Sequence, residues 1–389
     1  MTAFRRVPES DSRRYREILR YAFAPEEGPL DEEGEEWPPG PFDPYGLYDG
    51  GRLRSTCKLY DLDAWLREGT VRIGGLGAVA TLPEDRRQGY VRELCRHALD
   101  VFEERGARLV VLWPFETAFY AAFGWATAHD ERRYECPPAA LPSHDSAGRM
   151  RRFDPDEWER LREAEQAHGE GVALSLRRSP AWWSERTLTN WTGGTQPYIY
   201  GYERGGEVAG YLTYTVDDSG TLAVDTLAYA DEEAYRAILS VLGRHGAQIE
   251  RVEFTRPDGT SLLDRIDEPE RVDCAVGPGP MVRLPSVFAL DGTAWPETGL
   301  DCRLAVSDPL ESEPAVVRVQ TTDGTLRVST ADGSPAVRTD IGTLSQLVVG
   351  TYGVERARRL DAVTVDDERV LEELSATFEE QQVFLGEFF

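Results

Sequence analysis

Apolar residues follow a helical period most clearly between residues 91 and 105. Spacings of three and four residues connect Val91, Leu94, Cys95, Ala98, Leu99 and Phe102, and charged side chains fill most of the positions between them. This pattern is typical of an amphipathic helix that buries one face. A stretch that ends in Val79, Ala80, Thr81 and Leu82 precedes the helix, and an apolar stretch at 108–112 follows a glycine stop at Gly106. The pattern predicts a strand, a helix with Asp85 as its N-cap, and a second strand.

The same order of elements recurs in the middle of the chain. A strand is predicted at 225–229, a helix then runs to His245 and stops at Gly246, and another strand follows at 250–254. We interpret the two segments as diverged copies of one fold.

Three blocks emerge along the chain, as expected for 389 residues, which exceed what one hydrophobic core usually supports. Segments rich in proline and glycine at 137–148 and 277–280 separate them. The predicted domains are residues 1–140, 150–280 and 281–389. The second has a helix after Pro155 and strands at 198–203 and 208–216, and the third has a hairpin at 315–330, helices at 341–350 and 366–380, and an apolar tail.

The formal charge of the chain is -26, and Lys58 is the only lysine among 43 basic residues. Such a surface repels nucleic acid, so we expect no nucleic-acid partner. Two interpretations of the charge stay open. One is steering of cationic amines toward a site. The other, which we favour because acidic residues are spread along the whole chain, is adaptation to molar salt, where the Debye length is about 3 Å.

The cysteine and histidine residues, five of each, are widely scattered and form no C-x-x-C pair. We therefore expect neither a disulfide framework nor a metal site. No apolar run approaches the roughly 18 to 20 residues of a transmembrane helix, and the first residues contain no signal-peptide core. These features predict a cytoplasmic protein without a membrane partner.

The start of the first predicted helix carries Arg86, Arg87 and Gly89. A helix N-terminus offers free backbone N–H groups to a pyrophosphate, and a glycine lets the phosphate approach without a Cβ in the way. Taken alone, the same residues also fit an ordinary basic helix start.

Arg86, Gly89 and Val91 resemble the acetyl-CoA signature Arg/Gln-x-x-Gly-x-Gly/Ala of the GCN5-related N-acetyltransferase (GNAT) superfamily, although Val91 departs from the small final residue. Residues 112–125 resemble the segment Phe/Ile-Tyr-x-x-Phe-Gly-Tyr/Trp of these enzymes. With the duplicated fold and the aromatic C-terminus, the chain is similar to the enhanced intracellular survival (Eis) family over its whole length. The resemblance implies an α/β (α+β) fold, with tandem GNAT-like mixed sheets, flanking helices and a C-terminal sterol-carrier-protein-like α+β domain.

By this resemblance, the protein is an N-acetyltransferase that uses acetyl-CoA, with Tyr120 as general acid and the carboxylate of Phe389 as base. A phenol with a pKa near 10 can protonate a leaving thiolate, whereas a carboxylate is a weak base that orients the amine or acts through water. The residues expected to bind CoA are Val79, Ala80, Thr81, Arg86, Arg87, Gln88, Gly89, Tyr90, Val91, Arg92, Phe115 and Glu116. Glu26, Trp37 and Phe388 are expected near the acceptor. Tyr120 is also compatible with a purely structural role beside Phe119 and Phe123.

The second copy has Ala230, Asp231, Glu232 and Glu233 at its helix start. Because carboxylates repel a pyrophosphate, we expect this copy to bind no CoA and to serve as scaffold. The apolar residues of the third block are explained better by a small hydrophobic core than by the lipid-binding pocket that the resemblance implies. The acidic loop at 24–44 fits an entrance for a cationic amine and a solvated, salt-adapted insertion equally well.

The tail from Gln381 to Phe389 is too apolar for a solvated end. Nine residues reach about 30 Å, so the tail can bring Phe389 to the first block while its aromatic side chains anchor it. The acceptor would be a small-molecule amine, such as an aminoglycoside or polyamine, or lysine. The family also suggests a homo-oligomer, with hexamers as its form. A non-catalytic protein that holds CoA or a lipid is the competing hypothesis.

Overall fold

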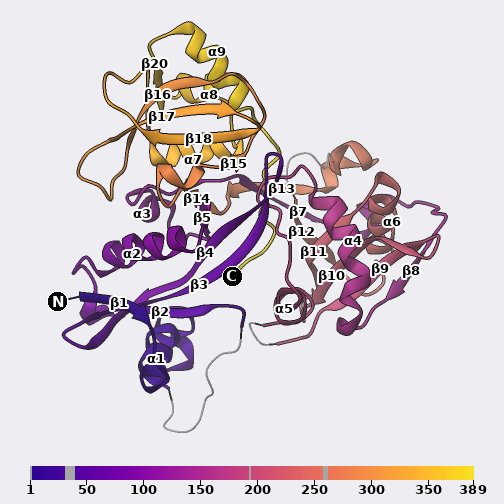
Figure 1. Ribbon diagram of the computed structural model, residues 1–389. Helices are drawn as coiled ribbons and strands as arrows, with labels where there is room; N and C mark the ends of the chain where they lie inside the picture. Colours follow the sequence, from indigo (N-terminus) through magenta and orange to yellow (C-terminus); the bar gives the residue numbers. More distant parts are fainter. Residues whose placement is uncertain (1, 31–39, 192–193, 257–261) are drawn as a thin grey trace. The chain divides into compact units, whose positions relative to one another are not determined.

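The computed structural model describes residues 2–30, 40–191, 194–256 and 262–389 (Figure 1). The chain divides into two compact units, one formed by residues 1–129 with 280–389 and the other by residues 130–279. None of the helices in these described ranges has both the length and the apolar character needed to cross a bilayer.

The first sheet has the strand order β1-β2-β3-β4-β5-β14-β6. Its strands are β1 (Thr2–Arg6), β2 (Asp43–Asp49), β3 (Arg52–Leu66), β4 (Gly69–Thr81), β5 (Leu109–Leu112), β14 (Met281–Arg283) and β6 (Ala126–Thr127). All neighbouring pairs are antiparallel except β4 and β5, which are joined by helix α2 (Tyr90–Glu104). Short helix α3 (Thr117–Ala121) follows β5, and α1 (Ser12–Phe23) follows β1. The predicted strand, helix and strand are therefore present.

The two faces of this sheet bury different elements (Figure 1). The apolar face of α2 packs on one side, where Phe102 lies against Gly74 of β4. Helix α1 packs on the other side through Tyr15 and Ile18. Because successive residues of a strand point to opposite faces, Gly75 faces away from α2. The chain end, marked C beside β3, reaches this opposite face.

The predicted N-cap of α2 is wrong. The helix begins at Tyr90, its N-cap is Gly89, and Asp85 lies in a preceding 3₁₀ turn, Pro83–Asp85. Asp85 is buried and accepts a hydrogen bond of 2.7 Å from Arg54 of β3. This ion pair holds the carboxylate away from the backbone N–H groups that an N-cap would satisfy.

The C-terminal part of the same unit forms a sheet of order β15-β18-β17-β16-β19-β20. Its elements are β15 (Thr293–Ala294), β16 (Asp301–Ser307), β17 (Ala315–Thr322), β18 (Thr325–Thr330), β19 (Val337–Asp340), β20 (Val363–Val365), α7 (Ile341–Val349), α8 (Val354–Arg359) and α9 (Glu368–Thr377). The predicted hairpin is β17 and β18, whose turn has Asp323 and Gly324 in left-handed conformations. Helix α9 is shorter than its prediction at both ends.

Arg67, at the tip of the β3–β4 hairpin, joins the first sheet to the end of α7 and to the segment after α9. Its guanidinium donates hydrogen bonds to the carbonyl oxygens of Leu347 (2.7 Å), Val348 (3.1 Å) and Glu379 (2.8 Å). Burial lowers the pKa of Arg67 to about 10. The bonds to Leu347 and Val348 satisfy carbonyl groups that the C-terminal turn of α7 leaves without helical partners.

The second unit repeats the topology of the first sheet, with order β13-β7-β12-β11-β10-β9-β8. Its elements are β7 (Asp130–Cys136), β8 (Arg149–Arg152), β9 (Tyr198–Arg204), β10 (Glu207–Val216), β11 (Thr221–Tyr229), β12 (Arg251–Arg256), β13 (Asp273–Pro278), α4 (Trp158–Gly169), α5 (Pro180–Trp182) and α6 (Glu232–Gly243). Strands β11 and β12 are parallel and flank α6, as β4 and β5 flank α2.

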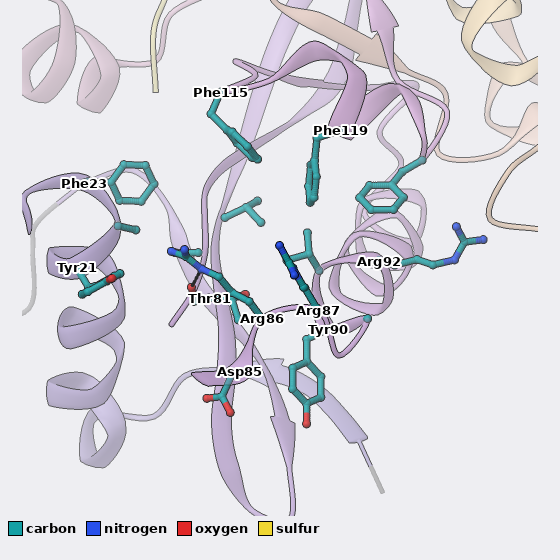
Figure 2. Close-up of a pocket in the computed structure, with 16 residues that line it drawn as sticks. Tyr21, Phe23, Thr81, Asp85, Arg86, Arg87, Tyr90, Arg92, Phe115 and Phe119 are labelled. Carbon is teal, nitrogen blue, oxygen red and sulfur yellow. Dashed lines mark hydrogen bonds between the residues drawn. The ribbon is translucent and has the colours of Figure 1, made fainter. Parts of the chain in front are cut away.

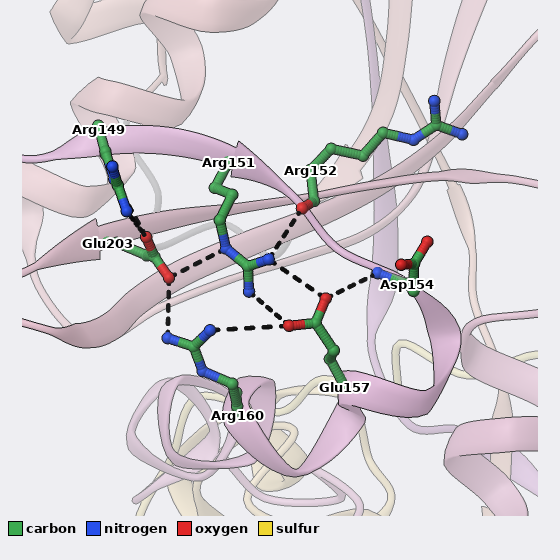
Figure 3. A network of polar contacts seen from close by, with 7 residues as sticks. All are labelled: Arg149, Arg151, Arg152, Asp154, Glu157, Arg160 and Glu203. Carbon is green, nitrogen blue, oxygen red and sulfur yellow. Dashed lines mark hydrogen bonds and ion pairs between the residues drawn. The ribbon is translucent and has the colours of Figure 1, made fainter.

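Arginine clusters balance the acidic residues of this unit. Figure 3 shows Glu203 of β9 between three guanidinium groups, from Arg149, Arg151 and Arg160. Arg151 also pairs with Glu157 at 2.7 Å, and the oxygen of Glu157 accepts from the backbone N–H of Asp154. The network fixes β8 against β9 and the start of α4.

Candidate functional site

A cavity of about 750 Å³ opens at the end of β4, beside the start of α2 (Figure 2). Its wall consists of Tyr21, Ala22, Phe23, Val79, Ala80, Thr81, Asp85, Arg86, Arg87, Gly89, Tyr90, Val91, Arg92, Phe115, Phe119 and Phe123. These residues come from the end of α1, the end of β4, the turn into α2, and the segment from β5 through α3. Most residues predicted to bind CoA therefore line one cavity, but Gln88 and Glu116 are not part of its described wall.

The separation of β4 from β5 creates space at the end of the parallel pair. Their pairing ends at Gly75 and Val111, whereas β4 continues to Thr81 along β3. The register between β3 and β4 shifts between Gly77 and Ala80 of β4. Within this bulge Ala78 has a φ of 51°, a conformation that residues with a Cβ rarely adopt. The bulge leaves the backbone of Val79 to Thr81 along the cavity without a strand partner from β5.

The N-terminus of α2 faces the cavity without a side-chain cap. Gly89 has a φ of 84°, and a Cβ built on it would meet no atom within 4 Å. Glycine is therefore required here by backbone conformation rather than by crowding. Arg86 and Arg87 lie beside this turn, and Arg86 donates from Nε to the carbonyl of Thr81 at 3.0 Å. Free N–H groups and two guanidinium groups form a suitable site for a pyrophosphate.

Asp85 does not oppose this positive site, because its charge is already neutralised. Its carboxylate lies 2.7 Å from Arg54 and 3.6 Å from Arg14. Arg92 also contacts the cavity, and its guanidinium donates to the carbonyl of Pro309. The loop before β17 is therefore bonded to the first turn of α2.

Aromatic rings form much of the remaining wall. The ring of Phe115 lies tilted against that of Phe119, with centroids 5.1 Å apart, and Phe119 lies 5.2 Å from Phe123. Tyr21 and Phe23 extend from the last turn of α1. Sequence analysis did not assign Tyr21, Ala22, Phe23, Phe119 or Phe123 to the site. The available signal was the presence of large aromatic residues just before a proline-rich loop.

Tyr120 lies behind this wall rather than in it. It is buried in the core below α2, with its ring between those of Phe115 (5.7 Å) and Trp125 (6.2 Å). Burial raises the pKa of Tyr120 well above its ordinary value. The phenol therefore stays protonated at neutral pH, as a proton donor must.

Phe389 is buried on the opposite face of β4. Its ring lies 5.1 Å from that of Tyr60, and a Cβ built on Gly75 would approach it to 2.8 Å. A Cβ built on Gly77 would lie 3.2 Å from the main-chain oxygen of Phe389. Glycines inside a strand commonly mark such a close approach of another backbone. The tail therefore ends beside the point where β4 leaves β5.

Hydrogen bonds hold the tail along its length. The backbone N–H of Gln381 donates to Gly350 (2.8 Å), that of Leu385 donates to Nε2 of His129 (3.0 Å), and Trp113 donates from Nε1 to the carbonyl of Glu387 (2.8 Å).

The residues predicted near the acceptor are not gathered at one place. Phe388 is mostly exposed and lies 5.7 Å from Trp113. Glu26 is exposed in a 3₁₀ turn after α1, and Trp37 lies outside the described residues.

The corresponding helix start in the second unit is occupied by its own carboxylates. Asp231 caps α6 by accepting from the N–H of Ala234 at 2.9 Å. Glu232 binds Arg265 bidentately, and hydrogen bonding from Arg265 lowers the pKa of Glu232 to about 2. These groups take the place that a phosphate would need.

Comparison with protein families identifies three domains. Residues 3–128 and 174–284 match two acetyltransferase (GNAT) domain families, and residues 288–386 match the sterol carrier protein domain. The predicted tandem GNAT-like sheets with a C-terminal sterol-carrier-protein-like domain are thus confirmed. The prediction of an acetyltransferase enzyme is confirmed at the level of these domains.

Solved structures share this architecture over their full length. A conserved protein of unknown function from Enterococcus faecalis V583, described as a probable N-acyltransferase, superimposes with a TM-score of 0.85 at 18% identity. A GCN5-related N-acetyltransferase from Anabaena variabilis gives 0.82 at 18%, and Eis1 from Mycobacterium abscessus gives 0.76 at 20%. Each alignment covers 100% of both chains. No curated protein sequence matches the chain. At these identities the likeness concerns the fold.

Proposed function

We propose that this protein is an acetyl-CoA-dependent N-acetyltransferase that modifies a primary amine of a small molecule or of lysine. The observation that carries the proposal is the uncapped N-terminus of α2, with Gly89, Arg86 and Arg87, opening into the cavity where β4 leaves β5. The same position in the second unit is filled by Asp231 and Glu232. Of the helix starts of α2 and α6, only that of α2 therefore suits a pyrophosphate.

The residues of the wall fit acetyl-CoA, which supplies an activated thioester when bound. The N–H groups at the start of α2 and the guanidinium groups of Arg86 and Arg87 would hold its pyrophosphate. The backbone of Val79 to Thr81 would bind the pantetheine arm and orient the carbonyl that reacts. Predicted contacts from Gln88 and Glu116 are not needed for this arrangement.

Two residues would manage the protons of the transfer. Tyr120 would be the proton donor to the departing sulfur. Because burial raises the pKa of its phenol and so weakens it as an acid, it would share its proton with the sulfur through a hydrogen bond. The carboxylate of Phe389, held beside Gly77, would accept the proton of the attacking amine, directly or through water. The location of the tail beside Gly75 and Gly77 supports this role, and its anchoring role is compatible with it.

We further infer which role each domain has and in which compartment the protein works. The predicted domain 1–140, without β7 and completed by β14, would carry catalysis. The predicted domain 150–280 together with β7 would be scaffold, and the rest of 281–389 would hold the tail. The charge of -26 supports function in a salt-rich cytoplasm. The resemblance to Eis supports a homo-oligomer, such as a hexamer.

The test is release of the CoA thiol from acetyl-CoA in the presence of amines. The panel contains polyamines, aminoglycosides, arylalkylamines and lysine peptides, at low and at molar KCl. We expect at least one amine to accelerate thiol release. If acetyl-CoA binds but no amine accelerates release, the protein is a binding protein and the proposal is wrong.

The role of Phe389 needs a separate test. A chain extended by two glycines keeps the Phe389 ring but replaces its carboxylate with an amide. We expect kcat to fall by about 100-fold, the range of general acid–base catalysis, with little change in the Kd of CoA. Unchanged turnover would remove this carboxylate from the mechanism.

A further inference from the structure

We propose that the cavity selects an acceptor whose primary amine is carried on a flat, apolar body, as in an arylalkylamine. Tyr21 and Phe23 would form the binding wall for that body, and Phe115, which is predicted to contact CoA, would border it. This inference rests on the proposed acetyl transfer and narrows its substrate class.

The cavity has two chemically different parts (Figure 2). The turn into α2 provides N–H groups and guanidinium groups, which suit phosphate. Tyr21 and Phe23 lie across the cavity from this turn, on the last turn of α1, and the ring of Phe115 projects into the cavity from the segment after β5. The side chain of Arg86 extends between the two parts, with its guanidinium carbon 5.8 Å from the centre of the Tyr21 ring.

The three rings are unusually exposed. Their exposed fractions are 46% for Tyr21, 62% for Phe23 and 71% for Phe115. Among the described residues, ten large apolar side chains are exposed, and three of them line this one cavity. A concentration of exposed aromatic surface at a concave site marks a ligand that covers it. Rings stack best on a flat partner, edge-to-face or offset.

The charges of the described wall do not suit a polycation. Apart from Arg86 and Arg87, whose charge the pyrophosphate would neutralise, the charged residues of this wall are Arg92 and one carboxylate, although acidic residues outnumber basic ones by 69 to 43 in the whole chain. That carboxylate belongs to Asp85, which is buried and paired with Arg54 and Arg14. An aminoglycoside or polyamine needs several carboxylates to replace the hydration of its ammonium groups. A single amine on an aromatic body needs one proton acceptor and an apolar wall.

Steady-state kinetics with matched amines tests the inference. At saturating acetyl-CoA, kcat/KM is compared for 2-phenylethylamine, ethylamine, spermidine and kanamycin. We expect 2-phenylethylamine to exceed ethylamine at least about tenfold, since apolar discrimination of this size is common in enzymes. A higher kcat/KM for spermidine or kanamycin than for 2-phenylethylamine would overturn the inference but leave the acetyltransferase proposal intact.

Variants locate the binding wall. Tyr21→Ala and Phe23→Ala should each lower kcat/KM for 2-phenylethylamine by about tenfold and leave ethylamine within about twofold. Phe288→Ala removes a ring exposed elsewhere in the same unit and should change neither value. The Kd of CoA should stay constant in all three. A Kd of CoA that rises as much as kcat/KM falls would show that the rings hold the adenine of the cofactor, and would overturn the inference.

A binding measurement separates this inference from the proposed function. Calorimetry of 2-phenylethylamine with the CoA-saturated protein should show binding that Phe23→Ala weakens about tenfold. Equal binding by wild type and variant would overturn the inference, whether or not any amine is acetylated. Failure of every amine in the thiol-release assay would instead overturn the proposed function.

Discussion

Replacing Asp308 by alanine should destabilise the first unit far more than breaking an exposed ion pair. Arg283 of β14 is buried, with 1% of its surface exposed, and binds Asp308 through two parallel hydrogen bonds of 3.1 and 2.7 Å. Its guanidinium also donates to the carbonyl of Phe123 at 2.7 Å and lies 5.4 Å from the Trp125 ring. Without Asp308, a guanidinium charge stays buried without its counter-ion.

The size of the effect follows from this geometry. Removing one partner of a buried ion pair costs about 3 to 5 kcal/mol. Asp308 is 14% exposed and Arg283 keeps its hydrogen bond to Phe123. We therefore expect a loss in the free energy of unfolding at the lower end of this range, about 3 kcal/mol. For a unit of this size, about 2 to 4 °C of Tm corresponds to each kcal/mol. Asp308→Ala should therefore lower the Tm of the first unit by roughly 6 to 12 °C.

The assay is thermal unfolding followed by calorimetry and tryptophan fluorescence, with Asp301→Ala as the matched control. Asp301 also binds an arginine, Arg318, through two hydrogen bonds, but both side chains are about half exposed. Exposed pairs contribute little, so the Tm of this control should change only slightly. Asp308→Asn keeps the oxygen that accepts from the N–H of Leu310 and from Nη1 of Arg283, but it replaces the acceptor of Nη2 by an NH2 donor, so it removes one hydrogen bond together with the charge. Equal shifts for Asp308→Ala and Asp301→Ala would refute the reasoning.

Three further predictions concern the site. Gly77→Ala should lower kcat with little change in Tm, because its Cβ would press on the main chain of Phe389 and displace the tail. Gly89→Ala should raise the Kd of CoA several-fold, because the free variant would relax the turn away from a φ of 84° and binding would have to restore it, at a cost of about 1 to 2 kcal/mol. Burial raises the pKa of Tyr120, so its phenol should stay neutral up to at least about pH 10 in an ultraviolet titration. Because the unfolded tyrosine ionises near pH 10 and the folded one above it, the free energy of unfolding should fall as pH rises beyond about 10.

Matched variants control these experiments. Gly69→Ala places a methyl group in open space on the same strand, and Gly106→Ala imposes a similar backbone cost, at a φ of 79°, beyond the other end of α2. Equal kcat in Gly77→Ala and Gly69→Ala would contradict the first prediction, and equal Kd values in Gly89→Ala and Gly106→Ala would contradict the second. A tyrosinate signal below pH 10 that disappears in Tyr120→Phe would contradict the third.

The sequence predicted those helices and strands that a local pattern of apolar residues and turn residues determines. The period of three and four residues located α2, and alternation around Asp323 and Gly324 located the β17–β18 hairpin. The N-cap failed because Arg54, 31 residues upstream, takes the carboxylate of Asp85, and no local signal records such a partner.

Long-range placement could be predicted only in part. A tail of nine residues could reach the first block, but its position beside Gly75 and Gly77 required the structure. Glycines in the middle of a strand were a usable signal for that close approach. The aromatic side of the cavity remained hidden because α1 and the segment after β5 are distant in sequence.

Strand β14 gives the chain an unusual order of assembly during synthesis. It fills the gap between β5 and β6, pairing Met281 with both Leu112 and Thr127. At about 5 to 20 residues per second, the apolar edge of β5 waits roughly 10 to 30 s on the ribosome for its neighbour. The whole second unit emerges during that interval and can fold first. A fragment ending at residue 140 would keep the β5 edge open permanently, which makes it a candidate for edge-to-edge aggregation.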